Sequence, residues 1–130
     1  MIDHLSTCAT DFAATRAFYA AALGALGYGC QAEAVMPAGA DGPARRTCAF
    51  GPPGKPVFWV IEVTAPATPR HMAFAAADRA GVDAFYQAAL SAGGLDNGAP
   101  GLRPQYHPRY YGAFVLDPDG NNVEACCHHG

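Results

Sequence analysis

The sequence predicts an α+β fold in which two βαβββ modules form a curled, open-sided barrel sheet. The first observation is a near repeat: FYAAALGALG at 18–27 and FYQAALSAGG at 85–94 agree at seven of ten positions, with a constant offset of 67 in the numbering, from 18 to 85. The second is that each copy follows one short strand pattern and precedes three more. We therefore predict one domain over 1–130, with module one at about 1–64, a joint at 65–70 and module two at about 71–130.

In module one, apolar periodicity and turn residues predict four strands and one helix. Thr10 or Asp11 can cap the helix, since each offers a side-chain oxygen to free backbone N–H groups, and Gly24 and Gly27 end it. A loop rich in Gly and Pro at 37–43 and the turn GPPGKP at 51–56 separate the later strands. The predicted elements are a strand at Ile2–Cys8, a helix at Phe12–Leu23, and strands at Tyr28–Val35, Arg46–Phe50 and Val57–Val63.

Module two repeats this order after a joint that Pro66 and Pro69 hold extended. The glycine-rich segment Leu95–Leu102 is expected to be only partly strand. In DPDGN at 117–121, the proline and glycine are typical of a hairpin turn. The remaining predicted elements are a strand at His71–Ala76, a helix from Arg79 or Val82 to Ala92, and strands at Tyr110–Leu116 and Asn122–Cys127.

Composition restricts the classes of partner. The net charge of -3 gives no broad basic surface, so neither nucleic acid nor an anionic membrane is expected to bind. No apolar run approaches ~20 residues, and the first residues lack the pattern of a secretory signal. The five cysteines include no Cys-x-x-Cys pair, which favours reduced thiols and a cytoplasmic location. Cys8 and Cys126 share strand parity with His4 and Glu124, so a catalytic thiol is an alternative there.

The repeat carries histidine and glutamate with it. His71 follows His4 at the same offset, 67, that relates the two helical segments. Glu62 and Glu124 occupy similar late-strand stretches, VIEV and NVEA, at an offset of 62. Two histidines and one carboxylate facing a common cup leave coordination positions open for substrate. We therefore predict a divalent metal ion, Fe, Mn, Ni, Co or Zn, on His4, His71 and Glu124.

Glu62 is the candidate fourth ligand. Its strand places Phe58, Val60 and Glu62 on one face and Trp59 and Ile61 on the other. If Trp59 fills the cup, Glu62 points outward and three ligands remain. The alternative to a ligand is a solvent-facing glutamate at a strand end.

The segment RPQYHPRYYG at 103–112 is the second candidate for a site. Prolines stiffen a loop, while tyrosine and histidine combine large apolar bodies with polar tips, as suits the rim of a small-molecule pocket. His107, Tyr110, Tyr111 and Trp59 are thus candidate substrate contacts, and an aromatic-packed surface loop is the alternative. Arg45 and Arg46 are candidates to hold an anionic substrate tail, or else ordinary surface charges.

The chain resembles the vicinal oxygen chelate superfamily, which includes glyoxalase I, extradiol dioxygenases, and the fosfomycin and bleomycin resistance proteins. The resemblance rests on IDH at 2–4, TRAFYAAALGALG at 15–27, HMAF at 71–74 and, above all, YYGAFVLDPDGNNVEA at 110–125. It implies metal ligands at His4, His71 and Glu124, a second carboxylate at Glu62 in the manner of glyoxalase I, and a homodimer. The scaffold supports several chemistries, so the activity depends on the site.

Three functions follow. The first is a small metal-dependent, glyoxalase-like lyase or isomerase acting on a small molecule with vicinal oxygens, in which the metal stabilises an enediolate-like intermediate and Glu124 or Glu62 is the base. The second is an Fe(II) extradiol-type dioxygenase, favoured by three ligands. The third is an antibiotic-binding resistance protein, metal-free or metal-assisted. The retained His and Glu residues favour the first two over a metal-free binder.

Overall fold

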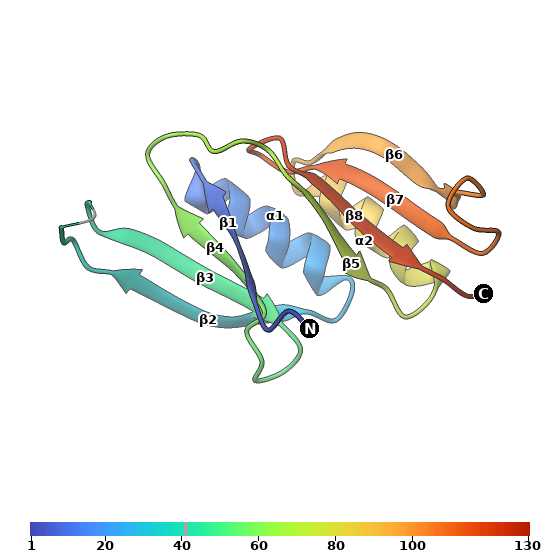
Figure 1. The fold of residues 1–130 in the computed structure, drawn as a ribbon, viewed down its shortest axis with the longest axis horizontal. Coiled ribbons are helices and arrows are strands. Elements are labelled where there is room, and N and C mark those ends of the chain that lie inside the picture. The colour runs from blue at the N-terminus through green and yellow to red at the C-terminus, as the bar shows by residue number, and fades with distance from the viewer. Residues whose placement is uncertain (41) are drawn as a thin grey trace.

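The computed structural model describes residues 1–40 and 42–130; position 41, inside the predicted loop at 37–43, lies outside the described residues. Figure 1 shows two similar halves arranged side by side. Module one comprises β1 (Leu5–Ala9), α1 (Phe12–Gly24), β2 (Gly29–Met36), β3 (Arg45–Gly51) and β4 (Phe58–Glu62). Module two comprises β5 (His71–Ala75), α2 (Arg79–Ser91), β6 (Leu95–Leu102), β7 (Tyr111–Leu116) and β8 (Asn122–Cys127).

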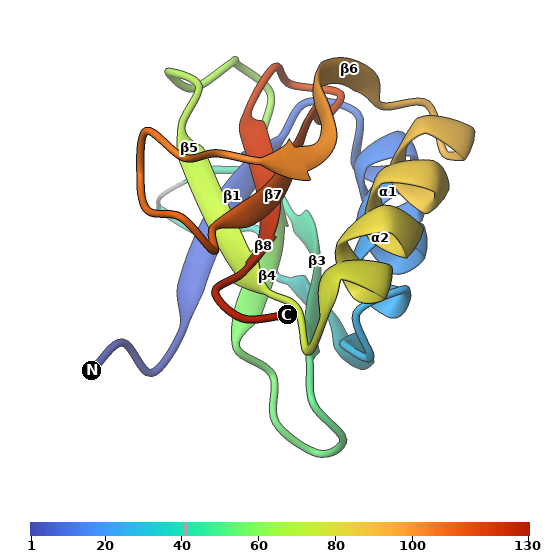
Figure 2. The ribbon, with the colours of Figure 1, turned by 90° about the vertical axis from the view of Figure 1, so that its right-hand side faces the viewer.

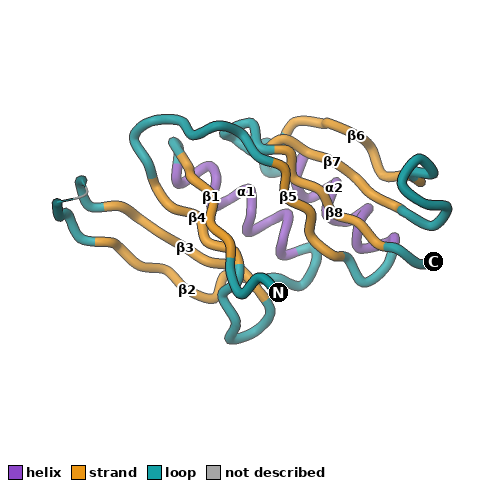
Figure 3. The backbone as a smooth tube through the Cα atoms, viewed as in Figure 1, coloured by secondary structure: helices purple, strands orange, loops and turns teal. Residues whose placement is uncertain are grey.

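Each module forms its own four-stranded mixed sheet. The strand orders are β1-β4-β3-β2 and β5-β8-β7-β6, so the first strand of each module pairs in parallel with its last. Strands β1 and β5 run in opposite directions at the centre of the molecule, and the tube in Figure 3 follows both sheets across the view. The predicted α+β class with two βαβββ modules is confirmed, and the sheet is not closed into a barrel.

Both helices cover the same side of the two sheets and pack against each other (Figure 2). We call the opposite side of each sheet its open face. Because side chains alternate along a strand, residues that pack under a helix are separated by residues that reach the open face. A single core lies on the helix side and joins both modules; it includes Phe58 of β4, whose ring centroid is 5.1 Å from that of Phe74 of β5.

Polar contacts also connect the modules. The buried Tyr19 hydroxyl of α1 donates to Asp117 Oδ2 in the turn before β8, at 2.6 Å. Burial and this carboxylate raise the pKa of Tyr19 well above its usual value. The Thr10 hydroxyl donates to Asp119 Oδ1 of the same turn at 2.6 Å. The DPDG turn therefore anchors module two both to the middle of α1 and to the residue before its N-cap.

The local signals are mostly confirmed. Asp11 rather than Thr10 caps α1, since its Oδ1 accepts from Ala14 N at 3.1 Å. Gly27 after α1 and Gly120 in the DPDG turn have positive φ angles of 86° and 83°. One difference concerns β6, which is a full strand whose register shifts twice, between Asp96 and Gly98 and between Gly98 and Gly101. The glycines bend this edge strand rather than end it.

A second difference concerns the repeat. Leu5 pairs with Phe58, and Met72, which corresponds to Leu5 at the helical offset, pairs with Val123. Strands β4 and β8 therefore correspond by the shift that takes Phe58 to Val123. This shift equates Glu124 with Trp59, and Glu62 with Cys127. The predicted equivalence of Glu62 and Glu124 is wrong by three positions, and an odd shift exchanges the two faces of a strand.

In the described part of the chain, no helix has the length and apolar character needed to cross a lipid bilayer.

Candidate functional site

The open face of module two brings His71 and Glu124 together. His71 pairs with Asn122 and Ala73 with Glu124 across β5 and β8, so the histidine and the glutamate are near neighbours on one face. Nε2 of His71 lies 3.0 Å from Oε2 of Glu124. The Glu124 side chain is only 3% exposed, whereas that of His71 is 51% exposed. A buried carboxylate thus lies beneath an imidazole that solvent or a ligand can reach.

Backbone contacts orient the His71 ring. Its Nδ1 lies 3.0 Å from the carbonyl oxygen of Asn122. Because a carbonyl only accepts hydrogen bonds, Nδ1 must carry the hydrogen, and Nε2 is the nitrogen presented to Glu124. A carbonyl that holds the far ring nitrogen is the usual support of a metal-binding histidine.

Tyr110 completes the surroundings of Glu124. Its hydroxyl donates to Oε1, the carboxylate oxygen that does not face His71. Burial, followed by the hydrogen bond to Glu124, raises the pKa of Tyr110 far above its usual value, so the phenol stays a donor. Gly112 leaves the necessary room, since a Cβ atom there would lie 3.1 Å from Glu124 Oε1 and 3.2 Å from Tyr110 Cε1.

An imidazole pair forms the rim of this site. Nε2 of His107 and Nδ1 of His128 lie 2.9 Å apart, and the two rings stack with centroids separated by 5.1 Å. Tyr110 packs edge-on against both rings, at 5.5 Å from His107 and 5.0 Å from His128. The predicted aromatic loop therefore brings His107 and Tyr110 to the site, while Tyr110 is committed to Glu124.

Cys126 follows Glu124 on the same face of β8, and its Sγ lies 4.0 Å from Nε2 of His128. Burial raises the pKa of its thiol, which keeps the sulfur protonated at neutral pH. This protonation disfavours Cys126 as a nucleophile.

Within one chain, His4 does not join His71 and Glu124. It precedes β1, and its Nδ1 lies 2.7 Å from Asp3 Oδ1 in an exposed pair. It lines a cavity with Lys55, Phe74 and Ala75, near the end of β5, whereas His71 begins that strand. Both histidines therefore stand at the beginnings of their strands, and because β1 and β5 run in opposite directions (Figure 1), these beginnings lie on opposite sides of the molecule.

Glu62 lies on the helix side of its sheet. Its Oε2 accepts from Arg46 Nε at 3.1 Å and Nη2 at 2.6 Å, while Oε1 accepts from the Arg46 backbone N–H at 3.0 Å. These bonds lower the pKa of Glu62. The Arg46 guanidinium in turn lies 4.9 Å from the ring centroid of Phe12, the first residue of α1. The structure thus separates Glu62 from the predicted metal ligands.

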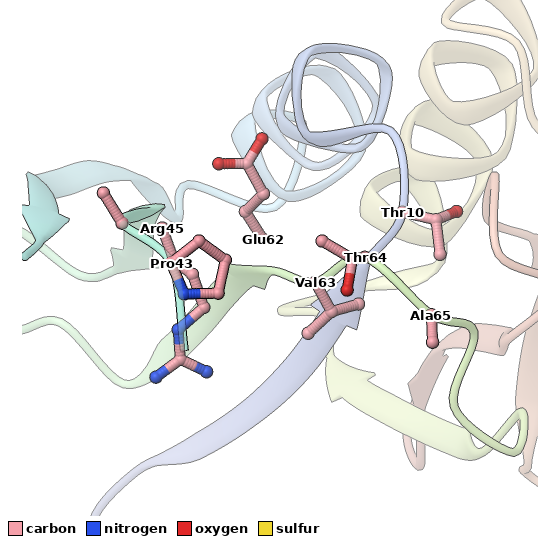
Figure 4. A pocket seen from close by; sticks show the side chains of 8 residues that line it. Thr10, Pro43, Arg45, Glu62, Val63, Thr64 and Ala65 are labelled. Carbon is pink, nitrogen blue, oxygen red and sulfur yellow. The ribbon is translucent and has the colours of Figure 1, made fainter. Parts of the chain in front are cut away.

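Figure 4 shows the surroundings of Glu62. Its carboxylate points to the side where α1 lies, and it borders a cavity of about 500 Å³. Arg45 also lines this cavity, whereas Arg46 is occupied by Glu62. Among the described residues, the lining contains neither a histidine nor a second carboxylate; it consists of Thr10, Pro43, Ala44, Arg45, Glu62, Val63, Thr64 and Ala65.

The other predicted substrate contacts separate in the same way. Trp59 faces the open side, next to Ser6 of β1 and Ala49 of β3, because Phe58 and Val60 occupy the core. Tyr111 faces α2, where its hydroxyl donates to Asp83 Oδ1 at 2.7 Å. Trp59 is therefore placed to contact a ligand on the open face of module one, and Tyr111 is not.

Several residues at the site were missed. Asn122 supplies the carbonyl that holds His71, Gly112 supplies space, and Phe114 has its ring centroid 6.2 Å from that of His71. The alternation of side chains along the last two strands could have predicted these residues. Every second residue of each strand reaches the open face, and these three fall in step with Glu124 or Tyr110. His128 lies beyond β8, where this periodicity no longer applies.

The donor set suits part of a metal site. Two donors each about 2.1 Å from a cation and at right angles are about 3.0 Å apart, which is the separation of His71 Nε2 and Glu124 Oε2. Across the described residues, no group of three or more His, Cys, Asp or Glu side chains is arranged to hold a metal ion. One chain therefore offers two well-supported donors, and any further ligand must come from solvent, a substrate or a second copy.

The fold and this site define an α+β protein of paired βαβββ modules with a His–Glu pair on an open sheet face. The profile of the Glyoxalase/Bleomycin resistance protein/Dioxygenase superfamily matches residues 1–125, and the chain belongs to this superfamily. The resemblance seen in the sequence motifs is thereby confirmed. No curated protein matches the chain.

Solved structures share the fold. A glyoxalase/bleomycin resistance protein from Albidiferax ferrireducens T118 is 27% identical, with 97% of each chain covered and a TM-score of 0.75. A glyoxylase/bleomycin resistance protein/dioxygenase domain from Frankia sp. EAN1pec is 14% identical, with coverage of 99% and 98% and a TM-score of 0.71. An E144Q glyoxalase I mutant from Zea mays is 20% identical with a TM-score of 0.70; 95% of this chain matches 45% of the maize chain.

Proposed function

We propose that this protein is a small metal-dependent, glyoxalase-like lyase or isomerase that acts on small molecules with vicinal oxygens. The observation that carries the proposal is the approach of His71 Nε2 to Glu124 Oε2. The Asn122 carbonyl holds the other ring nitrogen of His71, and the Tyr110 hydroxyl holds the other carboxylate oxygen of Glu124. Such support fixes both donors before a cation or substrate arrives. A divalent ion held there would act as a Lewis acid on two adjacent substrate oxygens.

The chain's own residues account for proton handling. Glu124 is buried, so an unpaired charge there would be costly, and its two partners offset this cost. Tyr110 engages one carboxylate oxygen and leaves the other available to accept a proton from a substrate carbon. The carboxylate becomes neutral as it accepts the proton, and the charge left on the substrate oxygens is the one that a bound divalent ion would stabilise. Glu62, the other predicted base, is tied to Arg46 and has no such access.

A homodimer provides the third ligand in this proposal. The open face of module two exposes His71, while His4 lies at an exposed strand end in the other module. If module one of one copy covers module two of another about a two-fold axis, His4 meets His71 and Glu124 twice in the dimer. Trp59, the counterpart of Glu124, would then close each site with an apolar wall in place of a fourth ligand.

A second function is favoured by the orientation of Glu62. Because Glu62 points away from the site, the proposed ligand set is His4, His71 and Glu124. This is the two-His, one-carboxylate arrangement of non-haem Fe(II) oxygenases. An extradiol-type dioxygenase is therefore the alternative proposal. The two functions differ in their need for oxygen and for a redox-active metal.

One experiment separates these functions. Metal-free protein is loaded with Zn²⁺ or Ni²⁺ and incubated in D₂O with the hemithioacetal of methylglyoxal and glutathione, and proton exchange at the substrate carbon is followed by NMR. We expect exchange in the wild type and in Glu62→Gln, and none in Glu124→Gln. Parallel samples loaded anaerobically with Fe(II) then receive catechol and oxygen. Oxygen uptake without proton exchange would replace the lyase by the dioxygenase, and failure to bind any metal would replace both by a binding protein.

A further inference from the structure

We propose that Arg103 forms a carboxylate-binding subsite beside His71 and Glu124, so that the substrate bears an anionic group in addition to its vicinal oxygens. The inference rests on the proposed function and names the substrate class. Arg103 bonds only to neutral backbone carbonyls among the described residues, so its charge is available to a ligand.

Arg103 shares the open face with the metal-binding candidates. It directly follows β6, and its backbone N–H donates to the carbonyl of Tyr110 at 2.8 Å, which places the two residues opposite each other. Residues directly opposite in a hairpin project to the same side, and the Tyr110 side chain reaches Glu124. The Arg103 Cζ atom lies 5.4 Å from the ring centroid of Phe114, and that ring lies 6.2 Å from the His71 ring. The Phe114 ring thus lies between the Arg103 guanidinium and the His71 imidazole and is close to both.

The guanidinium is held in a fixed position. Its Nη2 donates to the Ala99 carbonyl at 2.8 Å and its Nη1 to the Leu102 carbonyl at 3.3 Å. The glycines of the irregular strand make this possible. A Cβ atom at Gly98 would lie 2.9 Å from Phe114 Cδ2 and 3.3 Å from Arg103 Nη2, and one at Gly101 would lie 3.1 Å from Nη1.

The charge of Arg103 remains available. A guanidinium has five N–H donors, and two take part in the bonds to backbone carbonyls. Arg16 and Arg46 each form an ion pair with a glutamate, Glu33 and Glu62, whereas Arg103 forms none with the described residues. Neutral carbonyls orient the cation without neutralising it. A half-buried, oriented cation beside an open face is suited to an incoming anion.

The remaining N–H donors of Arg103 favour a carboxylate. The Cζ atom lies over the Phe114 ring and two N–H groups bind backbone carbonyls, so three of the five N–H donors are left for a ligand, and the planar fork of a guanidinium matches that of a carboxylate. The distance from Arg103 to the His71 ring is at most the sum of the two distances through Phe114, so a compact molecule spans both. The subsite therefore fits a small acid with two adjacent oxygens at its other end.

The test compares two probes that differ by one carboxylate. Zn²⁺-loaded protein is titrated with 3,4-dihydroxybenzoate and with catechol under anaerobic conditions, and binding is measured by calorimetry. We expect the wild type to bind the acid roughly tenfold more tightly or better, since hydrogen bonds to charged groups have that strength. Arg103→Met keeps an apolar stem over Phe114 and should abolish the preference while leaving catechol binding and zinc binding within about twofold. Arg103→Lys should keep part of the preference for the acid.

A purely structural role for Arg103, as a strut for the bent strand, would weaken both probes equally, and that result would overturn the proposal. Arg109→Met is the matched control: it removes the same charge from the exposed part of the same loop and should leave the preference intact. If zinc does not bind at all, the proposed function fails separately. Benzoate and benzamide are then titrated into metal-free protein by NMR, and the absence of an Arg103-dependent preference for benzoate would overturn the anion subsite itself.

Discussion

His71 Nε2 and Glu124 Oε2 lie 3.0 Å apart across β5 and β8, on the open face of the module two sheet. The parallel pairing of these strands produces the contact. It sets His71 of β5 beside Asn122 of β8, and Glu124 is the next residue of β8 on the same face. The corresponding pair in module one is His4 and Trp59. The molecule is therefore symmetric in its backbone and asymmetric in its chemistry.

The hydroxyl of Tyr110 is predicted to hold Glu124 ready for a metal. Tyr110→Phe leaves Glu124 Oε1 buried without its donor, so we expect metal affinity to fall about 10–100-fold and the free energy of unfolding to fall by about 1–3 kcal/mol. Metal titration and urea denaturation measure the two effects. Tyr106→Phe, on the exposed side of the same loop, is the control. Unchanged metal affinity in Tyr110→Phe would show that the phenol does not position the carboxylate.

Mixed dimers test whether the third ligand comes from a second copy. Neither the His4→Ala dimer nor the His71→Ala dimer contains an intact site. After the two variants are mixed and allowed to exchange subunits, each mixed dimer regains one site with both histidines and one site with neither. We expect metal content to recover on mixing, as measured by elemental analysis after dialysis. If His4 and His71 instead bind one ion within a chain, mixing restores nothing.

The Arg46–Glu62 pair is predicted to affect stability and not metal binding. Hydrogen bonds from Arg46 lower the pKa of Glu62, so the folded state holds this carboxylate ionised to lower pH than the unfolded state does. Its contribution is present above the ordinary pKa of a glutamate and is lost as the pH falls through the lowered value. The difference in unfolding free energy between wild type and Glu62→Gln should therefore shrink from pH 6 to pH 3. A pH-independent difference would contradict the ion pair.

Cysteine reactivity should follow burial. Burial raises the pKa of the Cys48 thiol to about 11, whereas Cys30 is exposed on the neighbouring edge strand. At pH 8 we expect iodoacetamide to modify Cys30 and to leave Cys48 unmodified in the folded protein, as read by mass spectrometry. The raised pKa also predicts that stability falls as the pH rises from about 9 through about 11, where unfolded thiols ionise first. Early modification of Cys48 would show that β3 is less protected than its burial indicates.

The sequence predicted the two modules, both helices and seven of the eight strands as strands, with β6 as a partial one, because their periodicity and turn residues are local properties. It also proposed His71, Glu124, His107 and Tyr110 as site residues, and the structure brings these four side chains together. It failed where the answer depends on pairing: the resemblance of VIEV to NVEA suggested that Glu62 mirrors Glu124, and only strand register shows that Trp59 does.

The partners of charged groups were equally inaccessible from the sequence. Arg46 and Glu62 are far apart along the chain, and nothing local shows that they meet across β3 and β4. Arg103 is similar, since its position over Phe114 depends on the bulges of β6 and on the glycines within it. Side-chain direction at an irregular strand is a tertiary property, so it required the structure.

Metal affinity in a matched pair of glutamate variants tests most directly whether Glu124, and not Glu62, binds the metal together with His71. Metal-free wild type, Glu124→Gln and Glu62→Gln are each titrated with Zn²⁺ or Co²⁺ by calorimetry, with His71→Ala as the second loss-of-ligand variant. We predict that Glu62→Gln binds like the wild type, whereas Glu124→Gln and His71→Ala lose binding by a factor of about 100 or more, as expected for the removal of a ligand. Equal losses in the two glutamate variants, or no metal binding in the wild type, would contradict the assignment of His71 and Glu124 as the metal ligands.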